Sequence, residues 1–225
     1  MKHQDRTEIS VRRRSCIAAI AATGIGGLAG CLDVIAGDEP YEAEASPARV
    51  SEETISETGY ERVEQEPIVI EREVEVADRT REIVVTNWLT EYEQTVNLGI
   101  LGEQEAAVFA VVTSPEISFV GREFNPIAEM TAEELVELVQ DQYDEVQDLT
   151  HEAEHETTVY RDETTESVFS GEATYEGQQF DIRLHVTEAV PMNDDFVVTI
   201  GAYPEEFAEE EENIRQLATS VEPDN

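Results

Sequence analysis

The stretch FDIRLHV, residues 180–186, decides the fold, because apolar and polar side chains alternate along it without interruption. Strict alternation is typical of a β-strand with one face in a core and the other toward solvent. It predicts that His185 points away from its two apolar neighbours, onto a polar outer face. The segment 168–175 precedes this strand across a Glu-Gly dipeptide, which predicts a hairpin.

Further strands are predicted on both sides of this hairpin, at 68–76, 83–98, 108–112 and 196–203. The third of these is continuously apolar, which indicates a central strand covered on both faces. Helices are predicted at 51–57, 131–149 and 205–220. Thr131 and Glu134 have the spacing of a capping box at the start of the second helix. The sequence therefore predicts an α+β fold, in which antiparallel sheet meanders have amphipathic helices packed on them.

The beginning of the chain has the order of an export signal. An uncharged run at 15–30 ends in Leu-Ala-Gly and is followed by Cys31. Three consecutive arginines come before this run: Arg12, Arg13 and Arg14. A basic head, an apolar middle and a small-residue processing site make a secretory signal, and the arginine pair resembles the twin-arginine type. Leu-Ala-Gly-Cys has the form of a lipobox, so we expect Cys31 to be lipidated and to hold the protein on the extracellular face of the cell membrane.

These features divide the chain into a signal peptide (1–30), a lipidated flexible tether (31–47) and a single α+β domain (48–223). An alternative is that the run 15–30 stays as an uncleaved membrane span, although a span needs roughly 20 mostly apolar residues. Cys16 leaves with the signal, so processing would leave one cysteine and no disulfide within the mature chain.

The composition is strongly acidic, with a formal net charge of −38 at pH 7. Lys2 is the only lysine, and it lies within the signal. In ordinary buffer so much like charge opposes a compact state, whereas molar salt screens it. We interpret the chain as an extracellular protein of an extreme halophile. The same charge excludes nucleic acid as a partner, because both would be polyanions.

One motif has the pattern of a zinc hydrolase: HEAEH, residues 151–155. On a helix, His151 and His155 would share a face and could hold Zn²⁺, with Glu152 as the base. The segment is almost entirely polar and follows the predicted helix 131–149. No third ligand is evident, since His185 falls on a strand. We therefore interpret the segment as a solvated helix end, with adventitious surface metal binding and a catalytic zinc site as the alternatives.

Three runs carry a resemblance that extends from about Ser46 to Val221: TNWLTEYE (86–93), LGEQEAAVFAVVTSPEISFVGREFNPIAEM (101–130) and LHVTEAVPMNDDFVVTIGAYP (184–204). Together with the Leu-Ala-Gly-Cys signal they resemble a family of haloarchaeal lipoproteins built on a domain of unknown function. The resemblance implies twin-arginine export and a lipid anchor, and it implies no catalytic residue. Cys16 and Ile17 stand where such signals usually have phenylalanine and leucine. The order of elements is also similar to the PsbP/Mog1 sandwich, an analogy of fold alone.

Two functions are expected from these observations. The first is a non-enzymatic binding or interaction module, held on the membrane through Cys31, that binds a small solute or another envelope protein and needs no cofactor. The second is a zinc-dependent extracytoplasmic hydrolase that uses His151, Glu152 and His155.

Overall fold

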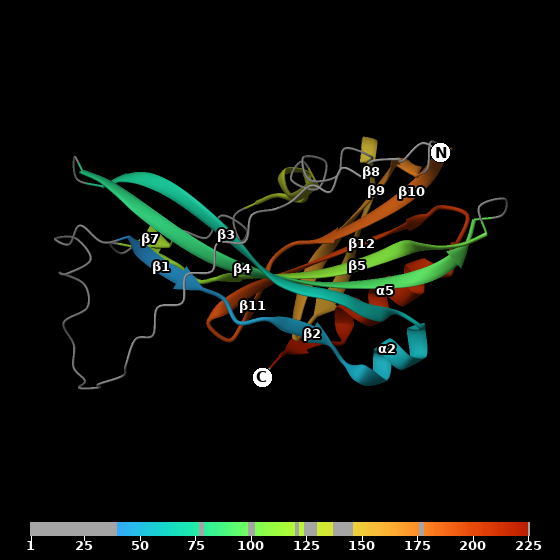
Figure 1. Ribbon diagram of the computed structural model, residues 1–225, viewed down its shortest axis with the longest axis horizontal. Coiled ribbons are helices and arrows are strands. Elements are labelled where there is room, and N and C mark those ends of the chain that lie inside the picture. The colour runs from blue at the N-terminus through green and yellow to red at the C-terminus, as the bar shows by residue number, and fades with distance from the viewer. Residues whose placement is uncertain are drawn as a thin grey trace, which may run out of the picture. The chain divides into compact units, whose positions relative to one another are not determined.

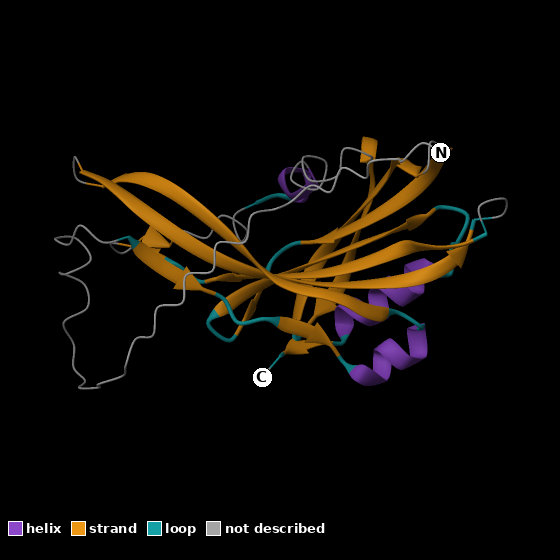
Figure 2. Cartoon of the chain, in the orientation of Figure 1, coloured by secondary structure: helices purple, strands orange, loops and turns teal. Residues whose placement is uncertain are grey.

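The computed structural model describes residues 40–76, 79–98, 102–119, 122–123, 130–136, 146–175 and 178–224, all within one compact unit, Gly37–Asn225. These residues are mostly β-structure (Figures 1 and 2). The elements are β1 (Tyr41–Glu44), β2 (Ala48–Val50), α2 (Glu52–Thr58), β3 (Glu61–Val76), β4 (Arg79–Asn97), β5 (Glu103–Pro115), β6 (Ser118–Phe119), β7 (Arg122–Glu123), β8 (Val146–Val159), β9 (Asp162–Tyr175), β10 (Gln178–Thr187), β11 (Val190–Met192), β12 (Asp195–Pro204), α5 (Glu210–Thr219) and β13 (Val221–Pro223). None of the described helices is both long and apolar enough to cross a bilayer.

One large sheet contains most of the strands, in the order β1-β4-β5-β12-β10-β9-β8, with β3 added to β4 and β11 added to β12. The sheet is mixed, because β1 runs parallel to β4 while the other pairs are antiparallel. The apolar run 108–112 lies in β5, between β4 and β12, as the central strand that the sequence predicted. The hairpin around residues 176–177 forms β9 and β10, in register from Tyr175–Gln178 onward.

The predicted α+β fold is wrong, because the molecule is a large mixed sheet with few helices. The helix predicted over 131–149 is the main cause. Its start is confirmed: the backbone N–H of Thr131 donates to Glu134 Oε2 at 2.9 Å, and residues 132–136 are helical. Residues 137–145 lie outside the described part, and Val146 and Leu149 already belong to β8.

A bulge explains why strand β8 has helical spacing of its apolar residues. The register of β8 against β9 shifts between Gln147 and Thr150, and Asp148 adopts a positive φ of 54°. The one extra residue brings Leu149 over Gly171, where an added Cβ would lie 2.5 Å from Leu149 Cδ2. Bulged strands lose their period of two, so their apolar residues can recur three apart.

The two faces of the sheet have separate cores. The first, which we call the α5 face, packs against α2 and α5, which lie on the same side of the sheet in Figure 2. Its largest buried members are Tyr60, Tyr92, Phe109, Met192, Tyr203, Ile214 and Leu217. The other, which we call the opposite face, packs against the helical residues 132–136 and contains Leu135, Phe169, Leu184, Val186 and Val198. The helix predicted at 51–57 is confirmed as α2, whose N-cap Ser51 accepts a hydrogen bond at Oγ from the Thr54 N–H and which ends at Gly59 with φ 79°.

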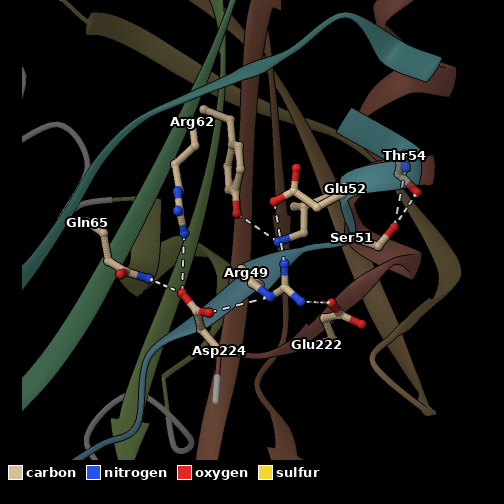
Figure 3. A network of polar contacts seen from close by, with 10 residues as sticks. Arg49, Ser51, Glu52, Thr54, Arg62, Gln65, Glu222 and Asp224 are labelled. Atoms are coloured by element: carbon tan, nitrogen blue, oxygen red, sulfur yellow. Dashed lines mark hydrogen bonds and ion pairs between the residues drawn. The ribbon is translucent and has the colours of Figure 1, made fainter. Parts of the chain in front are cut away.

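Ion pairs around Arg49 connect the two ends of the domain (Figure 3). Strand β2 pairs with β13, and the guanidinium of Arg49 contacts Glu222 at 2.8 Å and Asp224 at 3.4 Å. Arg62 contacts Asp224 as well, at 3.2 Å. The range 31–47, predicted as a tether, includes β1, whose Tyr41–Glu44 pair with β4; residues 31–39 lie outside the described part.

Gly201 of β12 allows α5 to lie close to the sheet. A Cβ there would meet Ile214 Cγ2 at 2.6 Å. We expect Gly201→Ala to lower the free energy of unfolding by about 1–3 kcal/mol, because overpacking forces the helix to shift. Urea titration in high salt measures this.

The control for Gly201→Ala is Ile214→Ala, alone and combined with it. Removing the Ile214 side chain removes the clash, so the double variant should be no less stable than Ile214→Ala alone. Fully additive losses would contradict this explanation.

Candidate functional site

A chain of buried polar side chains crosses adjacent strands on the α5 face. His185 Nδ1 lies 3.1 Å from Glu166 Oε1, and His185 Nε2 lies 3.1 Å from Tyr203 Oη. Glu166, His185 and Tyr203 are only 1%, 2% and 3% exposed. Arg215 of α5 closes the far end, because its Nε donates to Glu166 Oε2 at 3.3 Å. Buried polar groups are stable only when they are paired, and this chain pairs them in sequence.

Strand register brings these residues together. His185 on β10 pairs with Val168 on β9 and with Gly201 on β12, so Glu166 and Tyr203 lie two positions along on either side. The prediction that His185 faces away from its apolar neighbours is confirmed, whereas the predicted outer, polar face is wrong. α5 covers that face, and burial there requires the hydrogen bonds to Glu166 and Tyr203.

The electrostatics determine the ionisation of Glu166 and of Tyr203 at the two ends of the chain. Burial raises the pKa of Glu166, but the hydrogen bond and charge of His185 and the charge of Arg215 outweigh it, and the net pKa is lowered. Glu166 is therefore an ionised acceptor, and His185 Nδ1 must carry a hydrogen. Burial first, and then the charge of Glu211, raise the pKa of Tyr203, so its hydroxyl stays protonated. On the other side of the ring, His185 Nε2 shares a hydrogen bond with the Tyr203 hydroxyl.

A pocket of about 280 Å³ opens above Tyr203 and His185, between β8 and α5. Part of its lining is apolar and comes from Ala153, Val168 and Ala208. A concave site with apolar walls and a few fixed polar groups is the usual form of a small-molecule site.

Charged side chains form the rim of this pocket. Glu205 pairs with Arg183, at 2.6 Å between Oε1 and Nη2. Glu211 pairs with Arg215 at 2.8 Å. Glu152 accepts a hydrogen bond from Ser170 Oγ at 2.6 Å.

The HEAEH segment lies on strand β8, where it does not form a two-histidine site. The register pairs His151 with Phe169 and His155 with Glu166, and it shifts between His151 and Ala153. Directly paired residues of antiparallel strands point to the same face. His151 therefore belongs to the opposite face, where its ring lies 5.2 Å from that of Phe169, and His155 lines the pocket on the α5 face.

The separation of the two histidines contradicts a shared zinc ion, because the bulge turns the imidazoles to different faces. Among the described residues, no group of three or more histidine, cysteine, aspartate or glutamate side chains could hold a metal ion. Glu152 and His155 do meet at the pocket, although not in the roles that the motif predicted. The predicted lipidation residue Cys31 and the predicted export residues Arg12, Arg13 and Arg14 lie outside the described residues.

Comparison with protein families gives one assignment. The model of a domain of unknown function, DUF6517, matches residues 47–222. A comparison with proteins of curated annotation found no match. The expectation of a domain of unknown function over most of the chain is confirmed, while haloarchaeal origin, twin-arginine export and a lipid anchor remain predictions.

Proposed function

We propose that this chain, which belongs to the DUF6517 family, is a lipid-anchored binding protein on the outer face of a halophile's membrane, and that it holds a small solute in the pocket between β8 and α5. The observation that carries the proposal is the buried chain from Glu166 through His185 to Tyr203, which ends at this pocket.

Binding fits the chemistry of the pocket better than catalysis. The Tyr203 hydroxyl is a poor nucleophile, because its raised pKa keeps it protonated. The charged residues at the rim, Arg183 and Glu211, are held in ion pairs that fix their positions. Fixed polar groups around an apolar surface select a ligand by shape and hydrogen bonding.

Export and anchoring are supported by the order of arginines, uncharged run and cysteine in residues 12–31. The net charge of −38 supports a medium of high salt. The acidic surface also suits a domain that stays in solution beside its anchor.

Cys31→Ser should release the protein from the membrane. Attached lipid contributes about 0.8 kcal/mol per buried methylene, so we expect the membrane-bound fraction to fall at least about ten-fold. Fractionation of cells that express the variant, followed by immunoblotting of membranes and medium, measures the release.

Cys16→Ser is the matched control, since it changes the same residue type within the signal and should leave the anchor intact. Retention of Cys31→Ser in the membrane would contradict lipid anchoring and favour the uncleaved span.

The binding part of the proposal has a direct readout in the histidines. A small solute in the pocket should shift the imidazole resonances of His155 and His185 and leave that of His151, on the opposite face, unchanged.

A further inference from the structure

We propose that the open edge of strand β3 binds the same edge of a second copy of this chain, so that two domains join into one continuous sheet around a two-fold axis at Val69. The inference goes beyond the proposed function, because it assigns a surface that is separate from the pocket between β8 and α5. The contact is isologous, since each copy contributes the same strand to it.

Strand β3 has an open edge along its length. Among the described strands it pairs only with β4, so none of them lies on its outer side. In Figure 1 the two strands extend together to one end of the domain. Every residue from Glu61 to Glu71 is exposed or half-buried, which means that neither face of β3 is covered there. A long open edge presents a row of backbone donors and acceptors that can pair with another chain.

This edge also carries exposed apolar side chains. The large apolar side chains that are exposed in the described part of the chain are Val63, Val69 and Ile70, and all three belong to β3. Val69 is the most exposed of them, at 54%. With the half-buried Ile68 they include three consecutive apolar residues, 68–70, in a strand that otherwise consists largely of charged residues. Strand pairing at this point would remove apolar surface from water.

Pro67 indicates which peptide groups point outward. A proline cannot donate a hydrogen bond, so within a paired strand its nitrogen faces the open edge. Pro67 pairs with Trp88 in a register that runs uninterrupted on both sides of it. The peptide groups of alternate residues point to the same side of a strand. Those of Val69 and Glu71 therefore point away from β4 and toward a partner.

One antiparallel register suits both the peptide groups and the side chains. When Val69 lies opposite Val69 of the second copy, outward peptide groups meet, and the two valines exchange two backbone hydrogen bonds. Ile68 then lies opposite Ile70, so the apolar residues of the two strands meet one another. The same register sets Glu66 opposite Arg72 twice, and opposite charges across a ladder are favourable. Over residues 64–74 it opposes no two like charges.

The assembly stops at two copies, because the pairing uses the β3 edge of both. The other edge of the large sheet is β8, whose register against β9 shifts twice, and bulges turn an edge away from further pairing. At molar salt the Debye length is only ~3 Å, so the net charge of −38 on each chain does not keep the copies apart.

Cross-linking through one introduced cysteine tests the two-fold axis. In the proposed register the two Val69 Cα atoms lie about 5.5 Å apart, within the range of about 4.4–6.8 Å that a disulfide requires. We therefore expect Val69→Cys to form a disulfide-linked dimer when membranes of expressing cells are mildly oxidised in roughly 3 M KCl. A non-reducing gel measures the product, and the parent chain, which retains Cys31, is the blank.

Val63→Cys is the matched control, because Val63 is almost as exposed, at 49%, on the same strand. Its two copies would lie about twelve residues apart along the paired strands, or roughly 40 Å, so it should cross-link at least about ten-fold less. Equal cross-linking of the two variants would show random collision and overturn the interface. Failure of Val69→Cys to cross-link would overturn it too, and so would its cross-linking to a different protein in place of itself.

Sedimentation of the intact chain in detergent and high salt measures the contact without a covalent bond. Val69→Glu sets two carboxylates opposite each other at the axis, and we expect it to raise the dissociation constant of the dimer at least about ten-fold. Thr150→Glu adds the same charge at an exposed position of β8 and should leave the dimer unchanged. Thermal melting shows whether each variant is folded, and the cysteine experiment does not depend on the glutamate variants. A monomeric parent chain, or equal weakening by both variants, would overturn the second copy as the partner.

Discussion

Lowering the salt from roughly 3 M to about 0.1 M KCl should unfold the domain, because the Debye length grows from below ~3 Å to ~10 Å and repulsion between carboxylates is no longer screened. The formal charge of −38 is spread over a chain with 14 lysines and arginines, some of them before Cys31. Self-repulsion of this kind destabilises the compact state more than the unfolded one. Far-ultraviolet circular dichroism during salt dilution measures the transition.

Part of this repulsion lies between carboxylates on strand β4 and its neighbours in the sheet. Burial first, and then the charges of Glu93 and Glu64, raise the pKa of Glu91 on β4. Burial and the neighbouring Glu105 raise the pKa of Glu93. A carboxyl whose pKa is raised by folding binds its proton more tightly in the folded state, so its charge opposes folding at neutral pH and the penalty disappears as the pH falls through the raised pKa.

The raised pKa values of Glu91 and Glu93 provide the controls for the salt experiment. Glu91→Gln should shift the unfolding midpoint to lower salt, and mild acidification should do the same for the parent chain. Sucrose favours compact states but does not screen charge, so adding sucrose at low salt should not keep the domain folded as KCl does. A thermal midpoint that is the same in about 0.1 M and roughly 3 M KCl would contradict the interpretation as a halophilic protein.

Local patterns predicted the strands well, because they depend on few neighbours. The alternation in 180–186 gave both the strand and the direction of His185, and the start of α2 followed from Ser51. The start of the helix at Thr131 was also predictable from its capping box. In each case the physical cause lies within four residues along the chain.

The errors concern features that depend on strand pairing. The bulges in β8 gave Leu149 a helical spacing and turned His151 and His155 to different faces. Neither bulge has a sequence signal strong enough to identify it, since the partner strand β9 determines the register. The fold class was wrong because the described strands join in one large mixed sheet with few helices, and the last residues of the helix predicted over 131–149 belong to β8.

The site could not be predicted, because its members come from three strands and a helix. Glu166 is one of many acidic residues, and only its pairing with His185 and Arg215 distinguishes it. The one available signal was a histidine in a strictly alternating strand. A polar residue at such a position indicates either a solvated face or a buried network. Choosing between these two would have required knowing that a helix covers this face of the sheet.

Glu166→Gln should destabilise the folded protein by about 3–5 kcal/mol at neutral pH, because removing one partner of a buried ionic group leaves the others uncompensated. The amide cannot match the charge of Arg215, and it accepts a weaker hydrogen bond from His185 Nδ1. Urea titration in high salt measures the loss, with the exposed Glu163→Gln as the control that should change stability by less than about 0.5 kcal/mol.

The pH dependence of this loss tests its cause. The pKa of Glu166 is lowered by folding, so its ionised form contributes stability above the pKa of the unfolded chain, and the contribution is lost as the pH falls through the lowered folded value. The difference between parent and Glu166→Gln should therefore be largest at neutral pH and shrink in acid, whereas a purely steric effect of the amide would be the same at both. A constant difference would show that Glu166 stabilises the site by shape. A shrinking difference would show that the charge of Glu166, paired with His185 and Arg215, stabilises the buried chain that leads to the pocket.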